Sequence, residues 1–205
     1  MTRFSRAPRP ATPPRTAQLG ILGGVFDPPH VGHLALARAA LDQLGLERLL
    51  VLVVADPGHK LATTPAETRL ELTRLAFADV PEATVELDDH ARTVDSLEER
   101  KPENAVFILG ADELVGFSDW KGPERVLELV RLAVATRPGF SDERLREARA
   151  GLAAPDRVVF FEMRAVSVSS SEIRERVALG ESIDGLVPPR VASGIARLGL
   201  YASAE

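Results

Sequence analysis

The stretch LGILGGVFDPPHVGHLALARAALDQLG, residues 19–45, decides the first unit of the fold. Its apolar run at 19–24 ends in two glycines, as a buried strand that leads into a ligand-binding turn does. Leu34, Ala37, Leu41 and Leu44 then recur every three or four residues, which predicts a helix over 33–44 with Gly45 as its C-terminal cap. The stretch is therefore a strand, a glycine-containing loop and a helix in succession.

The same alternation of strand and helix continues along the chain. Further apolar runs predict strands at 49–55, 84–88, 105–110, 131–137 and 157–163. Helix signals predict helices at 64–78 and 169–179, each opening on a capping box (at Thr64 and Ser169), and at 141–150 and 188–198. We therefore expect an α/β fold, a Rossmann-like doubly wound parallel sheet of about six strands with helices on both faces. In such a sheet the ligand lies at the carboxyl ends of the strands, where the strand order reverses.

Composition and charge narrow the class of protein. The 205 residues include no cysteine and carry a formal net charge of −5, which excludes a disulfide scaffold and argues against coating of nucleic acid. No apolar run approaches the roughly 20 residues that a membrane span needs. The Pro- and Arg-rich segment 1–17 lacks the apolar core of a signal peptide. We expect a flexible leader at 1–17, a single domain at 18–205 and a cytoplasmic protein with no nucleic-acid or membrane partner. The oligomeric state stays open, a homo-oligomer included.

The loop after the first strand has the features of an anion site. Its two glycines let backbone N–H groups approach a ligand, and His30 and His33 stand three residues apart at the N-terminus of the predicted helix. The loop lacks both the glycine spacing of a dinucleotide fingerprint and the Gly-Lys-Ser/Thr end of a Walker loop. A metal hydrolase site built from Asp27, His30 and His33 is a weaker alternative, because no H-E-x-x-H pattern or carboxylate cluster accompanies it.

The residues of this loop, Gly23-Gly24-Val25-Phe26-Asp27-Pro28-Pro29-His30-Val31-Gly32-His33, resemble the G-G-x-F-D-P-x-H-x-G-H signature of the nucleotidyltransferase superfamily. That superfamily is similar to class I aminoacyl-tRNA synthetases in its H-x-G-H motif. From Leu19 to Tyr201 the chain resembles one branch, the bacterial nicotinate-nucleotide adenylyltransferases. The later motifs that carry this likeness are Asp56-Pro57-Gly58-His59-Lys60, Thr93-Val94-Asp95-Ser96-Leu97, Ile108-Leu109-Gly110-Ala111-Asp112, Trp120-Lys121, Thr136-Arg137-Pro138-Gly139 and Ser169-Ser170-Ser171-Glu172-Ile173-Arg174.

The resemblance implies adenylyl transfer from ATP to nicotinate mononucleotide, giving deamido-NAD and pyrophosphate in NAD biosynthesis. The attacking phosphate oxygen is largely ionised at neutral pH, so an in-line displacement without a covalent intermediate needs no strong general base. His30 and His33 are the implied catalytic residues, with His33 on the α-phosphate, and Mg²⁺ arrives with ATP rather than in a dedicated metal site.

The resemblance also divides the binding residues between the two substrates. The implied ATP-binding residues are Gly23, Gly24, Val25, Phe26, His30, His33, Gly110, Asp112, Ser169, Ser170 and Arg174. The implied mononucleotide-binding residues are Asp27, His59, Lys60, Thr93, Trp120, Lys121 and Arg137.

Two further interpretations stay open. A pantetheine-phosphate adenylyltransferase would share the first and last motifs, although the motifs at Thr93, Gly110 and Trp120 favour the nicotinate branch. A nucleotide-binding sensor that keeps the fold without turnover is the other, and the intact histidine pair argues against it. Arg92 stands where the nicotinate branch has a tyrosine. We expect Arg69, on the helix at 64–78, to be a solvated or snorkelling side chain.

Overall fold

The computed structural model describes residues 19–58, 62–136 and 142–203. In these ranges it contains the strands β1 (Leu19–Gly24), β2 (Arg48–Val54), β3 (Ala83–Asp88), β4 (Ala105–Gly110), β5 (Arg131–Thr136) and β6 (Val158–Glu162). The strands form one parallel sheet in the order β3-β2-β1-β4-β5-β6. The expected doubly wound parallel sheet is confirmed, and the strand order reverses between β1 and β4.

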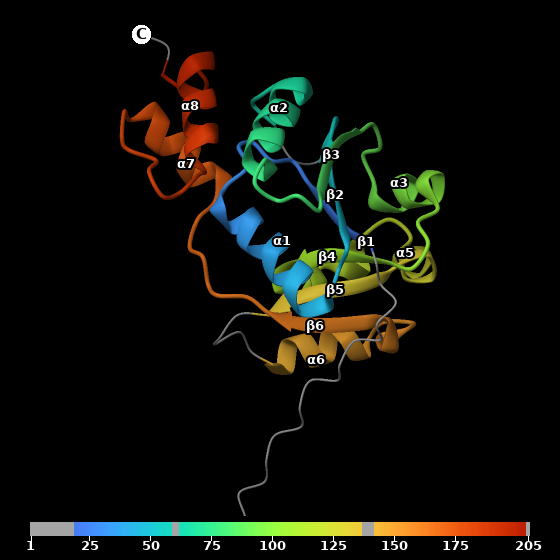
Figure 1. Ribbon diagram of the computed structural model, residues 1–205. Helices are drawn as coiled ribbons and strands as arrows, with labels where there is room; N and C mark the ends of the chain where they lie inside the picture. The colour runs from blue at the N-terminus through green and yellow to red at the C-terminus, as the bar shows by residue number, and fades with distance from the viewer. Residues whose placement is uncertain (1–18, 59–61, 137–141, 204–205) are drawn as a thin grey trace, which may run out of the picture.

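Helices connect the strands and cover the sheet. They are α1 (Val31–Leu44), α2 (Ala66–Phe77), α3 (Thr93–Arg100), α4 (Ala111–Val115), α5 (Pro123–Leu129), α6 (Asp142–Ala150), α7 (Ser170–Ala178) and α8 (Pro189–Leu198), with short 3₁₀ turns η1 (Phe117–Asp119) and η2 (Pro155–Arg157). One buried cluster joins the sheet to α1, α2, α7 and α8, and a second joins it to α3, α4, α5 and α6. Figure 1 shows α7 and α8 gathered beside α2, away from α6.

The caps of the helices agree with the sequence signals in part. Gly45 ends α1 in the left-handed conformation at φ 63°, as expected. Ser169 caps α7, since its Oγ accepts a hydrogen bond from the Glu172 amide at 3.1 Å. The predicted capping box at Thr64 is wrong, because Pro65 occupies the N-cap position of α2 and the Thr64 amide donates to Asp27 instead. A local sequence pattern does not indicate that a distant residue, here Asp27, will bind the same amide.

The two middle strands separate before they end. The pairing of β1 with β4 covers only Leu19–Ile21 against Ala105–Phe107, whereas β1 stays paired with β2 as far as Gly24. Beyond Ile21 the two strands diverge toward their carboxyl ends, and the sheet opens at the point where its order reverses. This opening positions the site described below. No helix in the described ranges is long and apolar enough to cross a membrane.

Candidate active site

A cavity of about 1260 Å³ lies at the carboxyl ends of the strands, over the opening between β1 and β4. Gly23 and Gly24 of β1 line one side of it, and Phe107, Ile108 and Gly110 of β4 line the other. Pockets for one small ligand usually measure about 300–1,000 Å³. The cavity therefore has room for two nucleotide-sized molecules, and the backbone edges of two separated strands face it.

Two stacked histidines stand at the N-terminus of α1, inside this cavity. His30 is the N-cap residue, and its ring lies 3.7 Å from the ring of His33, centroid to centroid, at an interplanar angle of 27°. Phe26 packs edge-on against the other side of His33 at 4.8 Å. A side chain at position 32 would place its Cβ 3.0 Å from Nδ1 of His30, so glycine there lets the stacked ring lie close to the backbone without a shift.

The surroundings of the two rings fix their protonation. Burial lowers the pKa of His30 to about 4, and burial together with the neighbouring His30 holds the pKa of His33 well below its ordinary value. Nδ1 of His33 accepts a hydrogen bond from the His30 amide at 3.1 Å, which places the proton of the neutral ring on Nε2. His33 is thus a neutral donor with a fixed tautomer, held between two other rings.

A second helix N-terminus is attached to the same loop. Ser170 of α7 donates from its Oγ to the Pro28 carbonyl at 2.8 Å. Arg174, one turn further on, donates to the Asp27 carbonyl at 2.6 Å and to Ser171 Oγ at 3.2 Å. Ser170, Ser171 and Arg174 all line the cavity. The N-termini of α1 and α7 therefore both present partial positive charge to it, which suits a polyphosphate.

The opposite side of the cavity carries the only tryptophan of the chain. Trp120 follows η1 and packs against Phe117 at 5.2 Å and edge-on against Phe107 at 6.0 Å. Lys121, beside it, donates to both carboxylate oxygens of Asp95 on α3, at 2.7 and 2.9 Å. Thr93, at the first residue of α3, also lines the cavity. Because Arg92 is the N-cap, Thr93 lies one residue inside the helix.

Both carboxylate oxygens of Asp27 accept hydrogen bonds from other residues of the protein. Its Oδ2 accepts hydrogen bonds from the Thr63 amide at 2.6 Å, from Thr63 Oγ1 at 3.0 Å and from the Thr64 amide at 3.3 Å. Its Oδ1 accepts from the Tyr201 hydroxyl at 2.7 Å. Burial alone would raise the pKa of this carboxyl, but the bonds from Thr64, Tyr201 and Thr63 outweigh it and lower the pKa. The carboxylate thus fastens the loop 25–28 to the start of α2 and to the end of α8.

The expectation that Arg69 is solvated is wrong. Its side chain is only 1% exposed, and it donates to the carbonyls of Val25, Val54, Ala55 and Thr64 at 2.7 to 3.0 Å. Arg69 therefore ties the loop after β1 to the loop after β2. Only the tertiary structure brings these four carbonyls together, so a helical position alone gave no signal.

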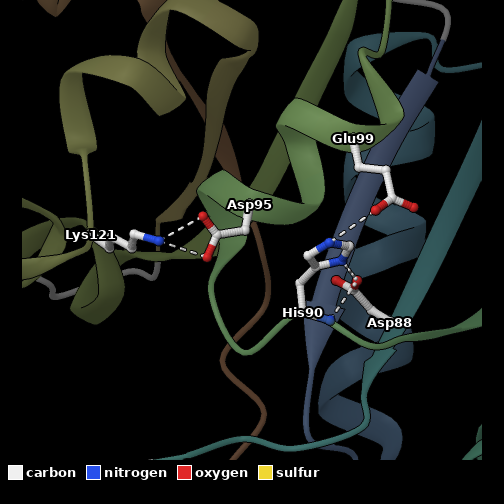
Figure 2. A network of polar contacts seen from close by, with 5 residues as sticks. All are labelled: Asp88, His90, Asp95, Glu99 and Lys121. Atoms are coloured by element: carbon white, nitrogen blue, oxygen red, sulfur yellow. Dashed lines mark hydrogen bonds and ion pairs between the residues drawn. The ribbon is translucent and has the colours of Figure 1, made fainter.

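Two other residues of the cavity escaped the sequence analysis. Glu113 of α4 accepts a hydrogen bond from the Gly110 amide at 2.6 Å. His90, in the turn between β3 and α3, lies between the carboxylates of Asp88 and Glu99 (Figure 2). Acidic and histidine side chains in a polar turn are ordinary in sequence, so neither residue carried a distinguishing motif.

The structure brings most of the candidate residues to one cavity. Those that line it are Gly23, Gly24, Val25, Phe26, Asp27, His30, His33, Thr93, Gly110, Trp120, Lys121, Ser170 and Arg174. Asp112 and Ser169 are not among its lining residues. The candidates His59, Lys60 and Arg137, and the segment 1–17, lie outside the described residues.

A metal centre at the loop finds little support in the geometry. In the described ranges no group of three His, Cys, Asp or Glu side chains is arranged to hold a metal ion. Asp27, which the metal alternative needs as a ligand, directs both carboxylate oxygens to Thr63, Thr64 and Tyr201. Divalent cations bound to a substrate polyphosphate would not need such a group.

The fold and the paired-histidine loop at its switch point define a protein of the nucleotidyltransferase type. The family described as cytidylyltransferase-like matches residues 21–176. The "probable nicotinate-nucleotide adenylyltransferase" of Rubrobacter xylanophilus is 40% identical over 196 residues, covering 90% of this chain and 92% of that protein. The protein of the same name from Thermus thermophilus is 40% identical over 193 residues, covering 90% and 99%. The chain belongs to the nicotinate-nucleotide adenylyltransferase family.

Solved structures agree on the architecture. A Plasmodium falciparum nicotinic acid mononucleotide adenylyltransferase, solved in complex with NaAD, superposes with a TM-score of 0.70 at 19% identity and covers 89% of this chain and 96% of that one. The same enzyme in complex with APC gives a TM-score of 0.69. At this identity the likeness establishes the fold.

Proposed function

We propose that the domain at 18–205 transfers the adenylyl group of ATP to nicotinate mononucleotide, forming nicotinate adenine dinucleotide and pyrophosphate in NAD biosynthesis. The observation that carries the proposal is the stacked pair of neutral histidines at the N-terminus of α1, inside a cavity with room for two nucleotides. Family membership supports the reaction. The Plasmodium enzyme, whose NaAD complex has this fold, supports the product.

The chemistry asks the protein for positioning and charge stabilisation. A phosphate oxygen of nicotinate mononucleotide attacks the α-phosphorus of ATP, the bond from that phosphorus to the bridging oxygen breaks, and pyrophosphate leaves with the electron pair. The nucleophile is ionised at neutral pH, so no side chain has to remove a proton. Negative charge grows on the α-phosphoryl oxygens in the transition state, where a preorganised donor is most effective.

We assign that donor to Nε2 of His33. The ring is neutral at physiological pH, its tautomer is set by the His30 amide, and its orientation is fixed between Phe26 and His30. His30 and the glycines of the loop support the triphosphate from the N-terminus of α1. Ser170 and Arg174, with Ser169 as the cap of α7, are assigned to the β- and γ-phosphates that leave.

The mononucleotide is assigned to the side of the cavity that carries Thr93, Trp120 and Lys121. Trp120 is half-buried in the wall of the cavity, where an indole can stack on a pyridine ring, and the N-terminus of α3 favours a ring carboxylate. Gly110 at the end of β4 is assigned to the ATP ribose. Mg²⁺ bound to the phosphates of ATP would neutralise charge on the leaving pyrophosphate, while Ser170 and Arg174 would contact the phosphates directly.

The test is pyrophosphate release from ATP and Mg²⁺ in parallel reactions with nicotinate mononucleotide, nicotinamide mononucleotide and phosphopantetheine. We expect fast release with nicotinate mononucleotide and little with phosphopantetheine. Release with phosphopantetheine alone would move the chain to the sister branch. No release with any acceptor, together with tight ATP binding, would favour the nucleotide sensor. Two further arms, EDTA and the same reaction restored by Mg²⁺, separate metal-dependent turnover from background hydrolysis.

A further inference from the structure

The turn between β3 and α3 contains a histidine held by two carboxylates from different elements. Nδ1 of His90 lies 3.0 Å from Oδ1 of Asp88 at the end of β3, and Nε2 lies 3.1 Å from Oε2 of Glu99 on α3. The His90 amide also donates to Asp88 Oδ1, at 3.3 Å. Figure 2 shows the ring placed between the two acidic side chains.

This geometry favours a proton on each ring nitrogen of His90. An ionised carboxylate only accepts hydrogen bonds, so contact with one at each nitrogen favours the imidazolium over the neutral ring. The hydrogen bond with Asp88, with smaller contributions from Glu99 and Asp95, raises the pKa of His90 despite the opposing effect of partial burial. The side chain of Asp88 is only 6% exposed, and that of Glu99 is 74% exposed. The cation thus links a buried end of the sheet to the surface of a helix.

The turn that carries His90 forms part of the cavity wall. The turn is four residues long, from the end of β3 at Asp88 to the start of α3 at Thr93, and His90, Arg92 and Thr93 all line the cavity. On its other side, the start of α3 is tied to Lys121 through Asp95 (Figure 2). The Asp88 carbonyl further accepts from the Ala55 amide at 2.8 Å, at the head of the loop after β2.

We propose that His90 is a positioning residue for the mononucleotide subsite, acting by holding the N-terminus of α3 and the turn 89–92 against the sheet. The inference rests on the proposed function, because it concerns how that site receives its acidic substrate. In this proposal His90 acts through α3 and not on the reacting phosphates. It sets the place of Thr93 and of the positive end of α3, which a ring carboxylate would meet.

The test compares His90→Ala and Glu99→Gln with wild type at pH 6. Loss of hydrogen bonds between charged groups is expected to raise KM for nicotinate mononucleotide about tenfold in His90→Ala and less in Glu99→Gln. The value of kcat and KM for ATP should stay within about twofold, since neither α1 nor α7 is touched. Glu98→Gln is the matched control, because Glu98 neighbours Glu99 on α3 but forms its ion pair with Arg125 of α5.

The dependence on pH separates a positioning role from a merely structural one. As pH rises through the raised pKa of His90, the wild-type ring loses one of its two donors. The ratio of the KM of His90→Ala to that of wild type should therefore shrink at alkaline pH, and titration of the substrate phosphate cancels in this ratio. A KM for the mononucleotide that stays at the wild-type value, an equal rise in KM for ATP, or a ratio independent of pH would each overturn the proposal.

A second readout does not depend on turnover. NMR titration of histidine-labelled protein measures the pKa of His90, whose signal is assigned by its loss in His90→Ala. This pKa should lie above the ordinary histidine range in wild type and should be lower in Glu99→Gln. An ordinary pKa for His90 would show that the imidazolium is not held between Asp88 and Glu99, and it would overturn the proposal. Absence of wild-type turnover with nicotinate mononucleotide, alongside a raised His90 pKa, would instead locate the failure in the proposed function.

Discussion

The hydroxyl of Tyr201 donates a 2.7 Å hydrogen bond to Oδ1 of Asp27, joining positions 174 residues apart. Asp27 belongs to the loop that carries the histidine pair, and Tyr201 lies just beyond α8. Arg174 of α7 donates to the carbonyl of the same Asp27. The last helices of the described chain thus hold its first loop in place, by bonds to the backbone and to a buried carboxylate.

Tyr201→Phe removes one donor from Asp27 while keeping the ring. We expect a loss of about 1.5–3 kcal/mol in the free energy of unfolding, because a hydrogen bond to a buried charge is lost. Urea denaturation at pH 7 measures it. Since Tyr201 is the only tyrosine of the chain, loss of its ultraviolet signal confirms the substitution, and in wild type the same signal follows the transition. An unchanged unfolding midpoint would mean that the other bonds hold Asp27 unaided.

The stability of the protein should fall as pH drops from about 6.5 to 4. In this range unfolded His30 and His33 bind protons, while the folded His30, with a pKa of about 4, and the folded His33, whose pKa is also lowered, do not. Below that range Asp27 adds to the loss, because its lowered pKa makes the unfolded carboxyl the better proton acceptor. Urea denaturation as a function of pH measures the slope. His30→Gln should reduce this slope between pH 6.5 and 4 and leave the part that His33 contributes, and a slope identical to wild type would contradict the assignment.

Arg69→Met should cost more than about 3 kcal/mol of stability, since it leaves several buried carbonyls without a donor. The exposed Arg74 on the same helix provides the control, and Arg74→Met should stay within about 0.5 kcal/mol of wild type. Thermal and urea unfolding compare the two. Equal effects would show that Arg69 contributes no more than a surface side chain.

His33→Ala should lower kcat by about 10²–10³-fold, as loss of one preorganised donor to a transition-state oxygen does. The dissociation constant of ATP should change much less, because the N-termini of α1 and α7 remain. Single-turnover kinetics and calorimetric titration with a non-hydrolysable ATP analogue separate the two quantities. Turnover that survives the change would remove His33 from the catalytic role.

Trp120 provides an intrinsic probe of the mononucleotide subsite. As the only tryptophan, it accounts for the indole fluorescence of the chain. We expect nicotinate mononucleotide to quench this fluorescence by stacking, and the non-hydrolysable ATP analogue alone to leave it nearly unchanged. Trp120→Phe should keep turnover with a raised KM for the mononucleotide. Quenching by the ATP analogue alone would reverse the assignment of the two sides.

The sequence predicts the strands and the histidine loop of this protein better than the hydrogen bonds that its buried polar side chains form with distant residues. Apolar runs located all six strands because buried parallel strands are continuous in sequence. The histidine loop was recognisable because strand, loop and helix N-terminus are neighbours in the chain. Arg69, Thr64 and His90 were misjudged or missed because their partners, Val25, Asp27 and Glu99, are brought to them only by folding. Buried polar groups must form hydrogen bonds, but the sequence pattern does not indicate with which residues they form them.

The short pairing of β1 with β4 leaves a line of weak connection, here called the seam, between the two halves of the sheet. Three strands lie on each side of it, and only the residues near Ile21 and Phe107 bind the two halves directly at the sheet. A dinucleotide laid across the seam would act as a splint between the halves. The protein should then be mechanically softer along this line when empty, and formation of its product should make it stiffer as a whole.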